Sequence, residues 1–295
     1  MVLACIDIGS NTTRLLVAEG RGRTLRPLVN ERAFTRIGKS LAADGSIPRE
    51  KIEETAQAVA AQAARARELQ AGRILAVATA AIRHAPNRAE LAASVEDAGA
   101  EPLWVLSPDE EARFSFVGAT RTLPEPPAGA VAVADVGGGS TEVAIGDAAG
   151  GVRWSRSWSV GSGSLTEAHV RSDPPSEDEL VQVRTEADRV LGSLGAPQAG
   201  TALAVGGTAA SMHRLAGPVL SQEALTRALE VLRGSTVAEI AARFELDPER
   251  VRLLPAGILV LTCLSERLGL PLEIARGGLR EGVLLELLEG PEAAA

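Results

Sequence analysis

Two stretches of this chain, far apart in sequence, have nearly the same pattern. In each, Asp stands between apolar residues and is followed by Gly, two small or polar residues, hydroxyl residues and an apolar run. The stretches are "CIDIGSNTTRLLVAEG" from residue 5 and "VADVGGGSTEVAIG" from residue 133. Each predicts a β-hairpin, because apolar runs flank a short turn that contains glycine. The repeat therefore predicts two similar lobes rather than one undivided domain.

The length and the strand pattern agree with a duplication. A chain of 295 residues suits one large domain or two of about 130–150 residues. "LPEPPAG", residues 123–129, is the best linker candidate, and a hairpin followed by mixed strands and helices begins again after it. We therefore expect an α/β fold. The extended segments "RILAVATAAIR" and "TALAVGG" are predicted as strands, and "PDEEARFSFVGATRTL" is predicted as a helix capped by Ser107.

Composition excludes several classes of protein. The net charge of −8 creates no field that would attract nucleic acid, and aromatic residues are too few for a base-stacking surface. The N-terminus lacks the features of a signal peptide, and no apolar run is long enough for a transmembrane helix. We expect a cytoplasmic protein with no membrane partner. Cys5 and Cys263 have no metal-binding spacing and are interpreted as buried free thiols.

The repeated loops have the chemistry of a phosphate site. A carboxylate at the strand end, glycines that let a backbone approach closely, successive N–H groups and hydroxyls can all converge on one anion. A plain hairpin turn also needs glycine, which is the alternative for either loop alone. Asp7 and Asp135 would repel a polyanion, so they favour a bound Mg²⁺ or similar hard cation. Glu142 is a third candidate for the metal, through a metal-bound water.

The motifs make a family resemblance specific. Both loops resemble the phosphate motifs of the actin-like, sugar-kinase ATPase superfamily, and "AVGGTAASM", residues 204–212, resembles its later glycine-rich motif. Within it, the chain resembles the exopolyphosphatase / guanosine pentaphosphate phosphatase family. The blocks that carry this resemblance span nearly the whole chain: "IDIGSNTTRLLVAE", "ATAAIRHAPN", "VLSPDEEARFSFVGA", "VADVGGGSTEVAIG", "VGSGSLTEAHV" followed by "DPPS", "AVGGTAA" and "GGLREGVLLELL".

The resemblance implies two actin-like (ribonuclease H-like) lobes with a substrate cleft between them. The first lobe would comprise residues 1–122 with a helix from 282–295 packed on it, and the second residues 123–281. Acids favour the first turn of any helix, so spacing alone does not choose among Asp109, Glu110 and Glu111. The family pattern identifies Glu111 as the general base. The phosphate-binding candidates are Gly9, Ser10, Asn11, Thr12, Arg14, Arg83, Gly137, Gly138, Gly139, Ser140, Thr141, Gly206, Gly207, Thr208 and Arg280.

The implied reaction is Mg²⁺-dependent release of terminal orthophosphate from inorganic polyphosphate. The alternatives are removal of the 5′ phosphate from guanosine pentaphosphate, phosphoryl transfer by a kinase or ATPase, and non-catalytic binding of an alarmone such as guanosine tetraphosphate. The chain departs from the family at Ser164, where many members carry a basic residue, and it resembles the short, two-domain form. A homodimer is compatible with the resemblance. Arg36 in "RIG" is a further basic residue, while His84 and His169 are interpreted as ordinary polar residues.

Overall fold

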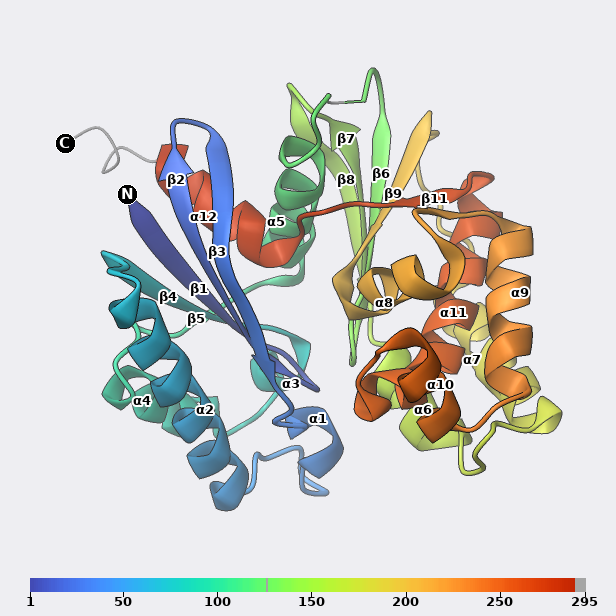
Figure 1. The fold of residues 1–295 in the computed structure, drawn as a ribbon, viewed down its shortest axis with the longest axis horizontal. Coiled ribbons are helices and arrows are strands. Elements are labelled where there is room, and N and C mark those ends of the chain that lie inside the picture. The colour runs from blue at the N-terminus through green and yellow to red at the C-terminus, as the bar shows by residue number, and fades with distance from the viewer. Residues whose placement is uncertain (126, 290–295) are drawn as a thin grey trace. The chain divides into compact units, whose positions relative to one another are not determined.

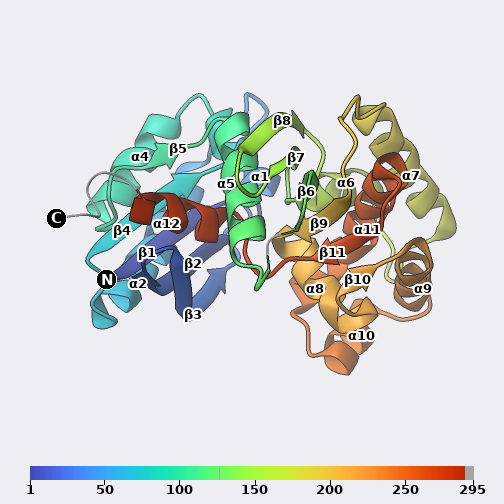
Figure 2. The same ribbon diagram turned by 90° about the horizontal axis from the view of Figure 1, so that it is seen from above.

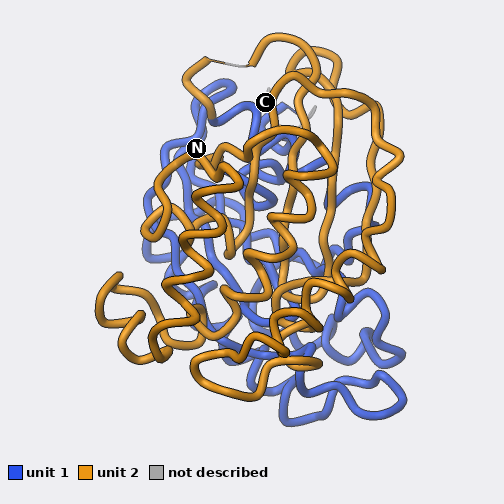
Figure 3. Tube along the Cα trace, turned by 90° about the vertical axis from the view of Figure 1, so that its right-hand side faces the viewer, with its two compact units in different colours: residues 1–122, 277–295 blue, residues 123–276 orange. Residues whose placement is uncertain are grey.

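The computed structural model describes residues 1–125 and 127–289. The chain folds into two compact units, coloured separately in Figure 3. Unit 1 runs from Met1 to Thr122 and resumes at Gly277, and unit 2 is Leu123–Arg276. Part of the expected C-terminal segment, residues 290–295, lies outside the described residues. No helix in the described part of the chain combines the length and the apolar character that crossing a membrane requires.

Unit 1 is built on a five-stranded sheet in the order β3-β2-β1-β4-β5 (Figure 1). β1, β2 and β3 form antiparallel pairs, whereas β1, β4 and β5 run parallel. The strands are β1 Val2–Ile8, β2 Thr13–Arg21, β3 Thr24–Ala33, β4 Arg73–Ala78 and β5 Trp104–Val105. The helices are α1 Ile37–Ser40, α2 Arg49–Glu68, α3 Ala80–Arg83, α4 Arg88–Asp97, α5 Pro108–Arg121 and α12 Leu279–Glu289.

Alternation along β1 explains how helices cover both faces of this sheet. Ala4, Ile6 and Ile8 face one apolar cluster that also contains residues of α2 and α4. Leu3 and Cys5 face the other, which contains residues of α5 and α12. Because side chains alternate along a strand, Asp7 falls on the second face. The central strand thus ends with a carboxylate among apolar neighbours, at the point where the glycine-containing turn begins.

Unit 2 is built on a six-stranded sheet in the order β10-β11-β9-β6-β7-β8 (Figure 2). β6, β7 and β8 form antiparallel pairs, while β6, β9 and β11 run parallel. The strands are β6 Val131–Val136, β7 Thr141–Asp147, β8 Gly151–Trp158, β9 Thr201–Val205, β10 Val219–Leu220 and β11 Leu272–Ile274. The helices are α6 Ser162–His169, α7 Glu177–Leu191, α8 Gly206–Ala216, α9 Gln222–Arg233, α10 Val237–Phe244 and α11 Pro248–Leu268.

The two sheets have the same topology once the added edge strand β10 is set aside. In each, a three-stranded antiparallel meander is continued by two parallel strands on the side of its first strand. The prediction of two similar α/β lobes is thereby confirmed. The repeat also holds residue by residue, since Asp7 is paired with Arg14 across β1 and β2, and Asp135 with Glu142 across β6 and β7.

Two predicted strands are shorter than expected. "RILAVATAAIR" leaves the sheet at Ala78, and the helix α3 begins at Ala80. "TALAVGG" leaves it at Val205, and Gly206 begins α8 with φ of 90°, a conformation that favours glycine. In both cases the apolar run continues from a strand into a helix. A continuous apolar run does not mark that boundary, because both elements are buried.

Close helix packing explains where the chain returns to unit 1. A Cβ on Gly118 of α5 would collide with the carbonyl of Gly278, and one on Gly282 of α12 would collide with the carbonyl of Phe114. Only glycine permits the two backbones to approach so closely. Gly277 is likewise packed against α5, at Thr122. The return therefore falls at Gly277, a few residues before the expected 282.

Candidate functional site

The first loop, Gly9–Thr12, presents a run of unused N–H groups. Gly9 N donates to Thr12 O at 3.0 Å, which closes a tight turn. Within the described residues, the backbone N–H groups of Ser10, Asn11 and Thr12 donate no hydrogen bond. The side-chain Nδ2 of Asn11 is also buried without a partner there. Buried donors are nearly always satisfied in a folded protein, so this loop has the chemistry of an anion cradle.

A distant segment orients this loop by holding its carbonyl groups. Gly38 N donates to Ser10 O at 2.7 Å, and Arg36 N donates to Asn11 O at 3.0 Å. Arg36 reaches this position in the left-handed region, with φ of 52°, which is uncommon for a residue other than glycine. With the carbonyls committed to one side, the N–H groups are available to a ligand on the other. Backbone strain of this kind often accompanies function.

The second loop, Gly137–Ser140, is constructed in the same way from different residues. Gly137 N donates to Ser140 O at 3.0 Å, and no hydrogen bond from N–H groups 138–140 is found in the described part of the chain. Here the first turn of α6 holds the carbonyls: Ser162 N donates to Gly137 O, and Gly163 N and Ser164 N donate to Gly138 O, each at 2.9 Å. The first turn of α6 therefore holds the loop carbonyls in unit 2, as the segment around α1 does in unit 1.

Thr141 and Ser164 use their hydroxyls within the protein. Thr141 Oγ1 donates to Val160 O at 2.6 Å, and the residue is fully buried. Ser164 Oγ accepts from Gly161 N at 3.0 Å and donates to Gly161 O at 3.1 Å. The phosphate contact expected of Thr141 stays a prediction, and in this structure its hydroxyl donates to the backbone. The hydroxyl of Ser164 therefore closes the turn that begins α6.

The carboxylates of unit 2 lie in one row across the sheet. Asp135 of β6, Glu142 of β7 and Ser157 of β8 are register partners and share a face. Glu142 is 2% exposed, and its Oε1 accepts a hydrogen bond from Ser157 Oγ at 2.7 Å. No group of three metal-ligating side chains is found among the described residues. Mg²⁺ needs only one or two carboxylates and keeps several waters, so the Asp135 and Glu142 pair fits such an ion.

The start of α8 adds a third glycine-rich turn beside Asp135. A Cβ on Gly206 would lie 2.6 Å from Asp135 Oδ1, and one on Gly207 would collide with the Arg250 guanidinium. Thr208 is buried against Gly257 of α11. Arg250, 7% exposed at the start of α11, therefore lies at the turn that the sequence predicts to bind phosphate. Sequence reasoning missed Arg250, because an arginine in "DPERVRLL" looks like an ordinary helix residue.

The three acids at the start of α5 have different environments in the structure. Glu110 completes a capping box with Ser107: its Oε2 accepts from Ser107 N at 2.8 Å, while Ser107 Oγ accepts from Glu110 N at 3.2 Å. Partial burial raises the pKa of Glu110, but the hydrogen bonds from Ser107 prevail and lower it. Asp109 is exposed. Glu111 is 6% exposed, which makes it the buried acid of the three.

Arg83 forms an ion pair with Glu111. Its Nη1 lies 3.1 Å from Glu111 Oε2 and also donates to the carbonyl of Leu106. Arg83 is positioned by α3, the short helix that replaces the end of the predicted strand. The structure therefore brings together Glu111 and Arg83, which the sequence predicted as base and phosphate ligand. A guanidinium so placed fixes the orientation of the carboxylate.

Arg280 lies inside unit 1. Its Nη1 donates to Leu15 O at 2.9 Å and to Asn30 Oδ1 at 3.0 Å, and the residue is 4% exposed. Burial, with the nearby charge of Arg14, lowers the pKa of Arg280 to about 10, against the opposing influence of Glu281 and Asp7. Arg280 was predicted to bind phosphate. These contacts hold its guanidinium on β2 and β3, near Asp7, and its binding of phosphate stays a prediction.

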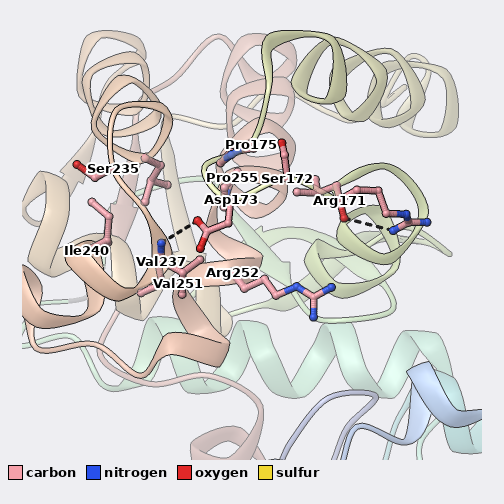
Figure 4. A pocket seen from close by; sticks show the side chains of 12 residues that line it. Arg171, Ser172, Asp173, Pro175, Ser235, Val237, Ile240, Val251, Arg252 and Pro255 are labelled. Atoms are coloured by element: carbon pink, nitrogen blue, oxygen red, sulfur yellow. Dashed lines mark hydrogen bonds between the residues drawn. The ribbon is translucent and has the colours of Figure 1, made fainter.

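Unit 2 also contains a cavity of about 250 Å³ on another side of α11 (Figure 4). Its polar groups are used internally, since Asp173 Oδ1 accepts from Val237 N at 2.8 Å and Arg252 pairs with Glu167 at 3.4 Å. Arg252 follows Arg250 by two positions, so the two point to different sides of the helix. The "DPP" motif at Asp173 therefore shapes a wall of this cavity rather than the loops.

The fold and the loops define a class of protein: a two-lobed α/β protein in which each lobe has a glycine-containing loop whose backbone N–H groups donate no hydrogen bond within the described residues. A family model, described as the Ppx/GppA phosphatase family, matches residues 16–290. The chain belongs to this family. The resemblance noted in the sequence is thereby confirmed.

Relatives with assigned names support the same placement. Exopolyphosphatase 2 of Mycobacterium tuberculosis is 29% identical over 97% of this chain and 98% of its own. The guanosine-5′-triphosphate,3′-diphosphate pyrophosphatase of Aeromonas hydrophila is 26% identical over 97% of this chain. The crystal structure of the Aquifex aeolicus member of the Ppx/GppA protein family matches with a TM-score of 0.81, at 29% identity over 98% of both chains.

Two of the matched relatives are covered only in part. The chain spans 59% of the length of the Aeromonas protein. An uncharacterized protein of Streptomyces coelicolor is 36% identical, over 50% of this chain and 43% of its own length.

Proposed function

We propose that the protein is an exopolyphosphatase, a phosphatase that hydrolyses terminal orthophosphate from inorganic polyphosphate. The observation that carries the proposal is the Glu111–Arg83 pair, a buried carboxylate held by a guanidinium in the unit whose loop bears unused N–H groups. Hydrolysis needs a group that orients and deprotonates water, and a carboxylate suits that role. A kinase would instead need an acceptor site, for which these residues provide no support.

Each part of the site has a role in this reaction. The N–H groups of residues 10–12 and 138–140 bind phosphate oxygens, and Ser10, Thr12 and Ser140 add hydroxyls. Glu111 accepts the proton of the attacking water, and Arg83 holds its carboxylate in one orientation. Arg83 acts here through Glu111, a positioning role added to its predicted contact with phosphate.

The carboxylates Asp135 and Glu142 would hold Mg²⁺, with Asp7 as the equivalent carboxylate of unit 1. When bound, the cation would neutralise charge that develops on phosphate oxygens. Without a cation, carboxylates and phosphates repel each other, which is why we include it in the proposal. The remaining glycines, Gly9, Gly137, Gly138, Gly139, Gly206 and Gly207, let the backbone approach the substrate.

The second candidate is removal of the 5′ phosphate from guanosine pentaphosphate. It is favoured by the similarity to the Aeromonas pyrophosphatase and uses the same groups on a different leaving group. Non-catalytic alarmone binding is less favoured, because Glu111, Asp135 and Glu142 are all present. The binding partners in this proposal are polyphosphate and guanosine pentaphosphate as substrates, and guanosine tetraphosphate as the product of the second reaction or as a bound alarmone. The proposed location is the cytoplasm.

The decisive experiment measures orthophosphate release from long polyphosphate, tripolyphosphate and guanosine pentaphosphate, with Mg²⁺ and with a chelator. We expect release from polyphosphate that the chelator abolishes. Glu111→Gln should lower turnover by about 10²–10⁴-fold, the usual worth of a general base. Glu110→Gln is the matched control, because glutamine also completes a capping box. Release from none of the substrates overturns the proposal, and near-normal turnover by Glu111→Gln removes that residue from the mechanism.

A further inference from the structure

Asn87 is the last residue of the block "ATAAIRHAPN", of which the proposed function uses only Arg83. Its side chain makes two hydrogen bonds to one residue, 40 positions earlier in the chain. Ile47 N donates to Asn87 Oδ1 at 2.9 Å, and Asn87 Nδ2 donates to Ile47 O at 2.9 Å. A side-chain amide can donate and accept at once, so it holds both backbone groups of Ile47. We call these two hydrogen bonds the Asn87 clamp.

The clamp takes the place of a helix cap. Asn87 is the N-cap residue of α4, a position that favours Asn because its side chain can accept from the first N–H groups of the helix. Ser107, Ser176 and Ser221 cap α5, α7 and α9 in this way, from an extended backbone. Asn87 has φ of −100° and ψ of 25° instead, and within the described residues its side chain makes no cap bond. The side chain is therefore committed to Ile47 rather than to its own helix.

On one side of the clamp lies the segment that holds the loop Gly9–Thr12. Two backbone N–H groups of the segment around α1 donate to carbonyls of that loop. From α1 the chain reaches Ile47 through a closed turn, in which Ala42 N donates to Ser46 O at 2.9 Å. Ile47 itself is 2% exposed. A movement of Ile47 would therefore be transmitted to α1 and to the loop.

On the other side of the clamp lies α3, which positions Arg83. Arg88, the residue after Asn87, returns to α3, since its Nη1 donates to Arg83 O at 2.9 Å. The Arg83 guanidinium in turn lies 3.1 Å from Glu111 Oε2. The position of Asn87 is therefore linked to that of the Glu111 carboxylate.

Apolar packing also joins these two segments. α1 and α3 are in contact (Figure 1), and Ile37 of α1, Ile82 of α3, Ile47 and Ala85 belong to one buried cluster. The hydrophobic effect is not directional, so this cluster alone does not fix how the segments align. Hydrogen bonds have a narrow range of distance and angle. The clamp therefore sets the alignment of the α1 segment against the end of α3.

We propose that Asn87 is a positioning residue for phosphate hydrolysis: through Ile47, it fixes the loop Gly9–Thr12 relative to Glu111 and Arg83. The inference rests on the proposed function for its reaction. It goes beyond that function by giving a role to Asn87, which acts through other residues. A remote residue of this kind matters because a displacement of about 1 Å at the reacting groups can cost about 10²-fold in rate.

The test uses the full chain and compares the wild type with Asn87→Ser. Ser is also a preferred N-cap residue, so α4 keeps a residue that can cap it, but a lone hydroxyl cannot replace both bonds to Ile47. With long-chain polyphosphate as substrate, we expect a higher KM, because the loop is displaced. We also expect a lower kcat, because Glu111 is no longer aligned with the bound phosphate. Together these changes should lower kcat/KM by about 10- to 100-fold.

A second variant and a matched control separate the clamp from general loosening. In Asn87→Asp, the carboxylate can accept from Ile47 N but cannot donate to Ile47 O, so KM and kcat should change in the same directions. Asp44→Ala is the control, because Asp44 Oδ1 accepts from Ser46 N at 2.9 Å and from Ser46 Oγ at 2.7 Å. This variant also removes two hydrogen bonds from the chain between α1 and Ile47, but it leaves the clamp intact. Its KM and kcat should equal those of the wild type.

Amide hydrogen exchange tests the clamp without any reaction. On the loop side, Gly38 N donates to Ser10 O at 2.7 Å, and in α3, Arg83 N donates to Thr79 O at 3.0 Å. Loss of the clamp should favour local opening, so both amides should exchange about tenfold faster in Asn87→Ser. Asp44→Ala should leave both rates unchanged. Thermal unfolding of each variant shows that it is folded at the temperature of the assay.

The outcomes separate this proposal from the proposed function. Unchanged KM and kcat in Asn87→Ser overturn it, and so does a change in only one of them, because the clamp would then not join the loop to the acid. An equal loss in Asp44→Ala also overturns it. A wild-type protein that releases no orthophosphate overturns the proposed function, and the exchange rates then decide. Unchanged exchange at Gly38 and Arg83 in Asn87→Ser overturns the clamp.

Discussion

The two lobes share a topology but place opposite charges at equivalent positions. The row Asp7, Arg14 and Arg32 in unit 1 corresponds to the row Asp135, Glu142 and Ser157 in unit 2. Only the first member is kept, and the neighbouring strand provides a guanidinium in one lobe and a carboxylate in the other. The second position of the row therefore carries a positive charge in unit 1 and a negative charge in unit 2. The two lobes therefore share backbone geometry, while two or three side chains in each lobe differ in charge.

Mutation of the second residue in each row, Glu142 in unit 2 and Arg14 in unit 1, should have different effects. Glu142→Gln removes a buried carboxylate from the proposed cation site, and we expect phosphate release to fall by about 10²–10³-fold, with a higher Mg²⁺ requirement. Arg14→Gln should instead raise KM for polyphosphate, by about tenfold, without moving the Mg²⁺ requirement. Mg²⁺ titrations of both variants are the measurement. A shifted Mg²⁺ requirement in Arg14→Gln alone would reverse the assignment of the two rows.

Ser157 is the third residue of the unit 2 row. It donates to Glu142 Oε1 at 2.7 Å, so it should hold that carboxylate in the orientation a cation needs. Ser157→Ala should raise the Mg²⁺ concentration at half-maximal activity by about tenfold, and Ser157→Thr should restore it. KM for polyphosphate measured at saturating Mg²⁺ should not change. If the Mg²⁺ titration of Ser157→Ala is unaltered, the hydrogen bond from Ser157 to Glu142 does not affect cation binding and is only structural.

Gly161 and Gly38 lie in the segments that hold the two loops, and they should differ in how well they tolerate substitution by alanine. A Cβ on Gly161 would lie 2.7 Å from Gly137 O, a rigid backbone atom. A Cβ on Gly38 would meet Ser10 Cβ at 3.1 Å and Ser10 O at 3.3 Å, which small movements relieve. Gly161→Ala should therefore destabilise the protein by about 1–3 kcal/mol, and Gly38→Ala by less. Denaturant unfolding of both variants gives the order, and the reverse order would contradict this description of the loops.

Low pH should lower the stability of unit 2 because Asp188 becomes protonated. Burial raises the pKa of Asp188, but hydrogen bonds from Arg184 and Arg267 prevail and lower it to about 2. A carboxyl whose pKa is depressed by folding contributes stability above its unfolded pKa of about 4, and this is lost as pH falls toward 2. Asp188→Asn should flatten that part of the stability curve, measured by unfolding at pH 2–5. The effect should be small, since the side chain is 38% exposed.

Some features of the protein could be predicted from local pattern. The Asp-Gly-hydroxyl repeat predicts both hairpins, since strand alternation and a glycine turn are local properties. The family motifs identified the correct phosphatase family, and Ser107 was correctly predicted as the cap of α5. The strand ends at Ala78 and Val205 could not be predicted, because a buried strand and a buried helix start have the same apolar composition.

A duplicated α/β fold with two glycine-rich acidic turns could be inferred from the amino-acid order alone, because periodicity and turn chemistry act over a few residues. Tertiary contacts were needed to show that Glu111 is the buried acid of "DEE" and that its partner is Arg83, which α3 places there from another part of the chain. The tertiary structure also decided that Arg250 lies against Gly207 and that Arg32 stands opposite Arg14. Those contacts join residues distant in sequence, and the register of strands and the packing of helices set them.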